Sequence, residues 1–80
     1  MPAMTGLKEL VSKALRLPAG PVADTLTMVE TRSWDSLAHM ELVLSIEERY
    51  RVNLSADEIV TMTSIAGIAA VLRAHGVELR

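Results

Sequence analysis

The sequence predicts an all-α fold, a small bundle of three main helices and one short helix, with a long loop after the first helix. Three observations support this prediction. Apolar residues recur at helical spacing in separate segments, nothing alternates at period two over a useful length, and a stretch containing proline and glycine follows the first helical segment. At 80 residues the chain has the size of one small domain, and we expect residues 1–80 to form it.

The first helix is expected over residues 5–15. Its apolar residues share one stripe: Leu7, Leu10, Val11, Ala14 and Leu15. Pro18 follows and helps to end the helix. Residues 17–33 are expected to form a long loop, because they contain Pro18, Gly20 and Pro21 and show no sustained period. Two interpretations of this loop stay open: it simply crosses the bundle, or it has a function of its own.

The second helix is expected over residues 36–50, with Asp35 as its N-cap. At about 100° per residue, its apolar residues divide between two faces. One, interpreted as the core face, holds His39, Leu42, Val43, Ile46 and Tyr50. The other holds Leu37, Met40 and Leu44, flanked by Glu41, Glu47 and Glu48. This second face is either covered by another helix or exposed for docking, and the carboxylates favour exposure because they are rarely buried unpaired.

A short helix is expected over residues 55–60, where Ser55 and Glu58 form the pattern of a capping box. The last helix is expected over residues 65–75. Two residues are candidates for its N-cap: Thr63 and Ser64. Its buried stripe comprises Ile65, Ile68, Ala69 and Leu72.

Composition and charge exclude several classes of site. The chain has no cysteine, and two isolated histidines do not make a metal site, so we expect neither disulfides nor bound metal. Residues 35–58 hold six acidic and two basic residues, a balance of −4 in a chain of net charge −2. This disfavours nucleic-acid binding and favours a basic protein partner. No signal peptide and no apolar run of ~18 residues is present, so we expect a cytoplasmic location without membrane insertion.

The residues Asp35, Ser36 and His39 raise the question of nucleophilic catalysis. Ser36 and His39 are close enough along a helix to touch. However, His39 falls on the core face, and no second donor or glycine-rich turn suggests an oxyanion hole. We therefore expect no enzyme active site and interpret His39 as a partly buried structural residue. What remains is a hydroxyl at a helix start, beside an apolar and acidic face, where another enzyme can attach a group.

The segment "DSLAHMELVLSIEERYRVNLSADEIVTMTSIAGIAAVL", with "TLTMVE" upstream, resembles phosphopantetheine carrier proteins of the acyl carrier type. The similarity covers nearly the whole chain, Leu7 to Leu72. It implies that Ser36 carries 4′-phosphopantetheine through a phosphodiester, added from coenzyme A by a phosphopantetheinyl transferase. It also implies that Asp35 and Leu37 belong to what the transferase reads. Acyl or aminoacyl cargo would be held as a thioester, and the chain itself would catalyse no turnover.

The resemblance assigns the second apolar face of the helix over 36–50 to partner recognition. The residues concerned are Leu37, Met40, Glu41, Leu44, Glu47 and Glu48. The partners it implies are the transferase, an acyl- or aminoacyl-loading ligase, and downstream synthases or transferases, all acting on a monomeric carrier. The main alternative is a small helical interaction domain without a prosthetic group. A peptidyl carrier of a peptide synthetase ranks lower, because its serine segment more often reads Gly-Gly-His-Ser.

Two departures from the family pattern matter. Arg32-Ser33-Trp34 stands where family members often have an apolar residue and glycine. We interpret Trp34 as a packing residue, with contact to the arm or a partner as the alternative. The chain is also less acidic than typical fatty-acid carriers, which favours a dedicated carrier for an aminoacyl, polyketide or other specialised acyl group.

Overall fold

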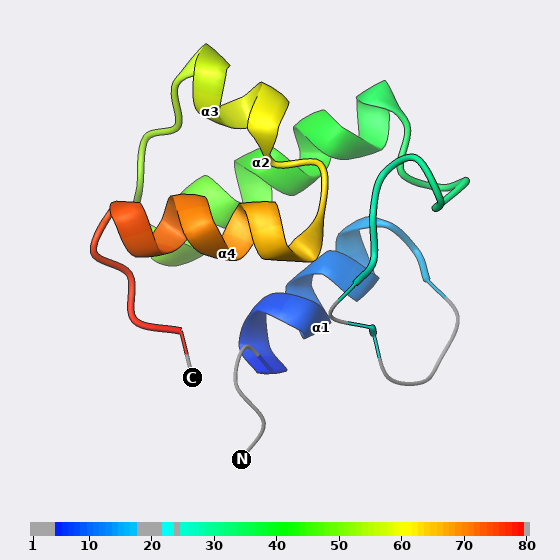
Figure 1. The fold of residues 1–80 in the computed structure, drawn as a ribbon, viewed down its shortest axis with the longest axis horizontal. Coiled ribbons are helices and arrows are strands. Elements are labelled where there is room, and N and C mark those ends of the chain that lie inside the picture. Colours follow the sequence, from blue (N-terminus) through cyan, green and yellow to red (C-terminus); the bar gives the residue numbers. More distant parts are fainter. Residues whose placement is uncertain (1–4, 18–21, 24, 80) are drawn as a thin grey trace.

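The computed structural model describes residues 5–17, 22–23 and 25–79. Its four helices are α1 (Thr5–Ala14), α2 (Ser36–Tyr50), α3 (Ala56–Thr61) and α4 (Ile65–Ala74), arranged as a small bundle (Figure 1). The described part of the chain contains no strand, so the all-α prediction is confirmed. Each helix lies within one residue of its predicted range at either end.

The bounds of α2 are set by local interactions at both ends. Asp35 is its N-cap, with one carboxylate oxygen accepting a hydrogen bond of 2.9 Å from the backbone N–H of Ala38. At the other end Arg51 has a left-handed backbone (φ 55°), and its N–H donates to the carbonyl of Glu47. The backbone N–H of Leu54 then donates to the Glu47 carboxylate at 2.9 Å, which fastens the segment after α2.

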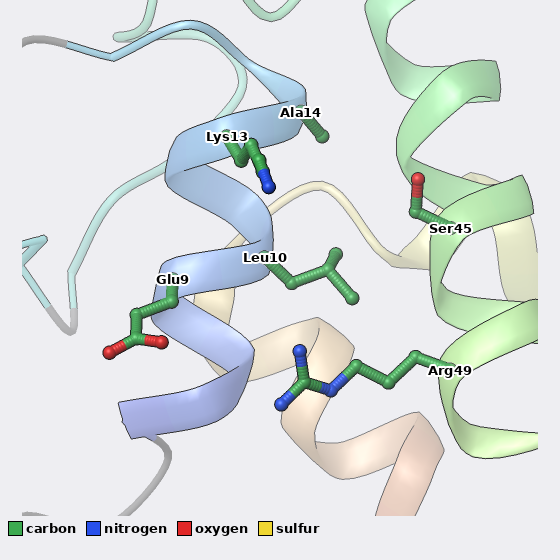
Figure 2. Close-up of a pocket in the computed structure, with 6 residues that line it drawn as sticks. All are labelled: Glu9, Leu10, Lys13, Ala14, Ser45 and Arg49. Atoms are coloured by element: carbon green, nitrogen blue, oxygen red, sulfur yellow. The ribbon is translucent and has the colours of Figure 1, made fainter.

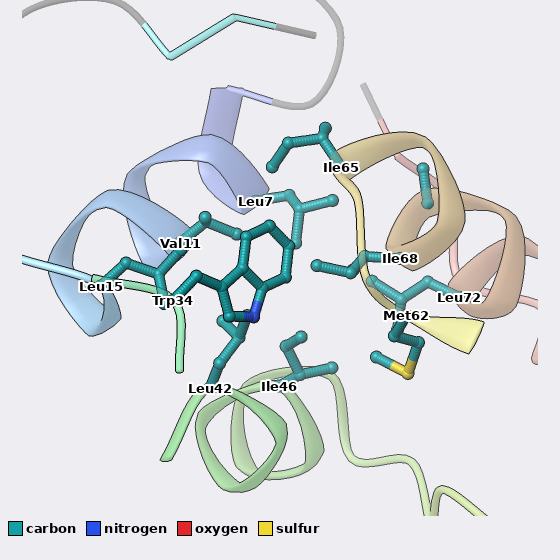
Figure 3. Packing of buried hydrophobic residues seen from close by; sticks show 11 residues of the cluster. Leu7, Val11, Leu15, Trp34, Leu42, Ile46, Met62, Ile65, Ile68 and Leu72 are labelled. Atoms are coloured by element: carbon teal, nitrogen blue, oxygen red, sulfur yellow. The ribbon is translucent and has the colours of Figure 1, made fainter. Parts of the chain in front are cut away.

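The predicted core face of α2 is buried, except for Tyr50, which is only partly buried. It packs in one aliphatic cluster with residues from α1 and α4 (Figure 3). Trp34 is 2% exposed, and Figure 3 shows its indole lying among these side chains. This confirms packing as the role of Trp34, and the alternative of an indole exposed to a partner is wrong.

The loop after α1 is fastened to the connection between α3 and α4. Met28 N–H donates to the Thr63 carbonyl at 2.8 Å, and Ile65 N–H donates to the Leu26 carbonyl at 3.1 Å. These two bonds flank an isolated antiparallel bridge between residues 27 and 64. The loop is therefore held in place by backbone hydrogen bonds where it crosses the bundle. The proline and glycine residues that predicted it, at positions 18, 20 and 21, lie outside the described residues.

Both short connections near α3 are closed by capping side chains. The capping box of Ser55 and Glu58 is present, as predicted. Of the two candidate caps of α4, the N-cap is Ser64, whose hydroxyl accepts a hydrogen bond of 2.9 Å from the Gly67 N–H. α3 itself buries no residue, and its Glu58 carboxylate lies 2.7 Å from Nε2 of His75, just beyond α4. Local caps therefore define α3, while its place in the bundle depends on a few tertiary contacts.

The start of α4 approaches the end of α3 closely because position 67 is glycine. A Cβ there would lie 2.7 Å from the Thr61 carbonyl oxygen and 3.1 Å from the Ser64 hydroxyl. Gly67→Ala should lower the free energy of unfolding, because overpacking costs about 1–3 kcal/mol, more than the ~1 kcal/mol that alanine gains in helix propensity. Urea denaturation measures the change, and a more stable variant would contradict the close approach.

Glu58 should make stability depend on acid pH. The backbone N–H of Ser55, opposed by desolvation and helped by His75, holds the pKa of Glu58 below its usual 4.5. Because the folded pKa is lower than the unfolded one, the stabilisation is complete above pH 4.5 and is lost as pH falls through the folded value. Glu58→Gln should therefore be less stable than the unchanged protein at pH 7, with the difference in urea midpoint shrinking below pH 4.5. A difference that stays constant down to acid pH would show that the carboxylate charge contributes nothing.

Candidate functional site

Ser36 is the first residue of α2 and is exposed. It directly follows the Asp35 cap, so the backbone that carries its hydroxyl is held by the first turn of the helix. The positive end of the helix dipole lies at the same place, which favours a negatively charged group such as a phosphate. The serine thus offers a hydroxyl that is accessible, rigidly mounted and placed for an anionic substituent.

The side chains around Ser36 are already committed to structure. Trp34 Nε1–H donates to Nδ1 of His39 at 2.9 Å, and Nε2 of His39 lies 2.8 Å from the carbonyl oxygen of Ile59. A carbonyl only accepts, so Nε2 carries the proton and Nδ1 is the acceptor. Both ring nitrogens are therefore used, and His39 has none free to act as a base for Ser36. The geometry agrees with the rejection of a catalytic triad.

The second apolar face of α2 is not covered by another helix. The exposed fractions of Leu37, Met40 and Leu44 are 71%, 47% and 62%. Val60 of α3 is 70% exposed and was not expected from the sequence. The only signal for it was the shortness of α3, since a helix of six residues presents little of its surface to a core. The exposure of this face is confirmed, its use in docking stays a prediction, and α3 adds one apolar residue to the exposed surface of the bundle.

The three flanking carboxylates differ in what they contact. Glu41 and Glu48 are exposed. Glu47 is half-buried, and its carboxylate accepts the hydrogen bond from Leu54 described above. The left-handed turn at Arg51 brings the chain back over the last turn of α2, where Glu47 meets it. Glu47 therefore has a structural role, and Glu41 and Glu48 are the carboxylates that remain free to face a partner.

Two hollows, each of about 260 Å³, lie between α1 and α2. One is lined by Glu9, Leu10, Lys13, Ala14, Ser45 and Arg49, and Figure 2 shows Arg49 reaching across it toward α1. Arg49 therefore turns away from the exposed apolar face. The other lies beside the start of α2, where its lining includes Asp35 and Leu37, the two neighbours of Ser36. This hollow therefore lies next to Ser36, although Ser36 itself does not line it.

Comparison with known proteins identifies the class of protein. Residues 5–72 match the family model described as phosphopantetheine attachment site, so the chain belongs to that family. It is similar to polyketide-8 synthase acyl carrier protein 2 of Streptomyces avermitilis, with 34% identity over 61 residues, 76% of this chain and 70% of the relative. The resemblance seen in the sequence is thereby confirmed.

A solved structure supports the fold. The holo acyl carrier protein from Geobacter metallireducens superimposes with a TM-score of 0.77 over 92% of this chain and 85% of that chain. Their sequences are 20% identical, so this likeness concerns the fold alone. Fold and family together make the chain a carrier protein with 4′-phosphopantetheine as its prosthetic group, and they do not favour an interaction domain without one.

Within the described ranges, no group of three or more potential ligands could hold a metal ion. None of the described helices has the length and apolar character needed to cross a membrane.

Proposed function

We propose that Ser36 is the residue that carries 4′-phosphopantetheine, joined through a phosphodiester to its side-chain oxygen. The observation that supports it most is an exposed hydroxyl at the capped start of α2, bordering the exposed apolar face. Other serines are poorer candidates. The hydroxyls of Ser55 and Ser64 cap α3 and α4, and Ser12 and Ser45 are half-buried. Ser33 is exposed but lies in a turn, outside any helix start.

The chain contributes position to the attachment reaction, while the transferase contributes the chemistry. Ser36 supplies the attacking hydroxyl, and Asp35 holds the first turn of α2. His39 cannot accept the serine proton, because its acceptor nitrogen is bonded to Trp34. We propose that the transferase supplies the proton acceptor and that coenzyme A is the donor. The Ser36 oxygen would bond to the phosphorus next to the pantetheine, the pyrophosphate bond of coenzyme A would break, and adenosine 3′,5′-bisphosphate would leave. When attached, the group supplies a terminal thiol that holds acyl cargo as a thioester.

We further propose that partner enzymes dock on the exposed face of α2. Leu37, Met40 and Leu44 would supply apolar contact area. Glu41 and Glu48 would steer a basic surface toward it, since rim charges act mainly on the rate of association. Asp35 and Leu37, on either side of Ser36, would be read by the transferase. Loading ligases and downstream synthases or transferases would use the same face.

The cargo is proposed to be a polyketide-type or other specialised acyl group. The Streptomyces relative is named as a carrier of a polyketide synthase, which supports this class. The net charge of −2 is small for a carrier of the fatty-acid type, in agreement with a dedicated pathway.

Attachment to Ser36 is tested by intact mass. After incubation with coenzyme A and a phosphopantetheinyl transferase, the unchanged protein should gain one phosphopantetheinyl group and Ser36→Ala none. Because the Ser36 side chain is exposed, the free energy of unfolding of the variant should lie within about 0.5 kcal/mol of that of the unchanged protein. Ser33→Ala, a matched exposed serine three positions away, should be modified normally. A mass gain in Ser36→Ala would show that another residue carries the group.

Docking is tested by the salt dependence of loading. Glu41→Lys should slow modification by about threefold or more at low ionic strength, and added salt should shrink this gap because exposed charges are screened over roughly 8–10 Å. Glu9→Lys makes the same charge change on an exposed residue of α1 and should have little effect. Equal slowing by both variants would mean that net charge, rather than the α2 face, governs association.

The apolar part of the face should behave differently. Met40→Ala removes contact area worth roughly 1 kcal/mol, so it should raise KM for the carrier about fivefold with little dependence on salt. Melting curves check that the fold is kept, as expected for a side chain that is 47% exposed. Strong destabilisation would show that this stripe is part of the core.

A further inference from the structure

A series of hydrogen bonds links the segment before Ser36 to α3. It starts at the Trp34 indole N–H, passes through both nitrogens of His39 and ends at the carbonyl of Ile59. Trp34 is 2% and His39 8% exposed, so the bond between them is shielded from water, while the bond to Ile59 is partly buried. Each donor in this series has one acceptor, and only the neutral His39 with its proton on Nε2 fits both bonds.

α3 depends on these hydrogen bonds because few other contacts hold it in place. With six residues it is far too short to be stable alone, and none of its side chains is buried. The core residue Met62 follows it directly and fixes one end, while Glu58 reaches His75 only at an exposed position. The partly buried bond from His39 to the Ile59 carbonyl is a polar contact that holds the body of α3 against α2.

We propose that His39 and Trp34 are positioning residues that fix the orientation of α3 relative to the start of α2. Met40 follows His39 on α2, and Val60 follows Ile59 on α3, and both side chains are exposed. The bond between His39 and Ile59 therefore couples the turn that presents Met40 to the turn that presents Val60. Trp34 contributes by orienting His39, because its N–H holds the His39 ring in the tautomer and orientation that this bond requires.

A consequence follows for docking, and it rests on the proposed function. If a partner bound to the exposed face of α2 also contacts the exposed Val60, that second contact requires α3 to keep its orientation. Loss of these hydrogen bonds should then weaken docking of the transferase without altering the attachment step, because Ser36 and the Asp35 cap remain in place.

The positioning role is tested by amide hydrogen exchange in the unmodified protein. His39→Phe keeps a ring but leaves the Ile59 carbonyl and the Trp34 N–H without partners. The α3 amides, such as Ile59, should then exchange on the order of tenfold faster relative to those of α1. Ile46→Val is a core substitution on α2 that leaves these hydrogen bonds intact. It should not change amide exchange in α3 more than in the other helices. His39→Gln, which keeps a donor and an acceptor, should restore part of the protection and serves if His39→Phe does not fold.

Two further measurements complete the test. Nitrogen NMR of the His39 ring should show Nε2 protonated and Nδ1 unprotonated at neutral pH. With the transferase, His39→Phe should raise KM for the carrier several-fold at unchanged kcat. If α3 is no more affected by His39→Phe than by Ile46→Val, the positioning role is overturned, whatever the transferase does. If exchange responds but KM does not, the consequence for docking is overturned. Failure of the unchanged protein to be modified at Ser36 would overturn the proposed function and leave the exchange result standing.

Discussion

A buried indole must find a partner for its N–H, and much of this structure follows from how Trp34 does so. Trp34 fills the centre of a core that is otherwise aliphatic, and its N–H points to His39. That bond makes Nδ1 of His39 an acceptor, so Nε2 becomes the donor that reaches the carbonyl of Ile59. One packing residue thus determines the state of a histidine and, through it, how a short helix is held.

α2 serves two functions that its two faces keep apart. Its buried face provides the core contacts and the histidine, while its opposite face leaves apolar side chains in solvent. A small domain gains little stability from exposed leucine and methionine, and their presence beside Ser36 supports the proposal that other proteins dock there. The carboxylates around them divide in the same way. Glu47 closes the turn after α2, and Glu41 and Glu48 remain on the surface.

A carrier of this kind needs a rigid point of attachment rather than a catalytic pocket. Two groups near Ser36 that could transfer protons have structural roles: one oxygen of Asp35 caps α2, and His39 bridges Trp34 and Ile59. This arrangement supports the proposal that another enzyme supplies the chemistry at Ser36. A hollow near the end of α1 and the start of α2 is lined by Asp35 and Leu37, the neighbours of the proposed attachment residue.

The sequence by itself determined what depends on neighbours along the chain. Helical periodicity, the Asp35 cap and the capping box at Ser55 placed the helices to within a residue, because these signals act over three or four positions. The division of α2 into two faces also follows from its periodicity, whereas the exposure of the second face was only favoured by its flanking carboxylates until the structure showed it. Ser36 emerged from its position at a helix start and from the resemblance of the surrounding segment to a family.

Only the tertiary structure decided the contacts between segments distant in sequence. Nothing local shows that the loop after α1 pairs with residues 63–65, or that His39 reaches Ile59 twenty positions away. The choice of Ser64 over Thr63 as cap was likewise open until the start of α4 was in place. The resemblance assigned Glu47 to the partner surface, and only the structure shows that one oxygen of its carboxylate also accepts a hydrogen bond from Leu54. These outcomes depend on how the whole bundle closes, which no pattern of a few residues records.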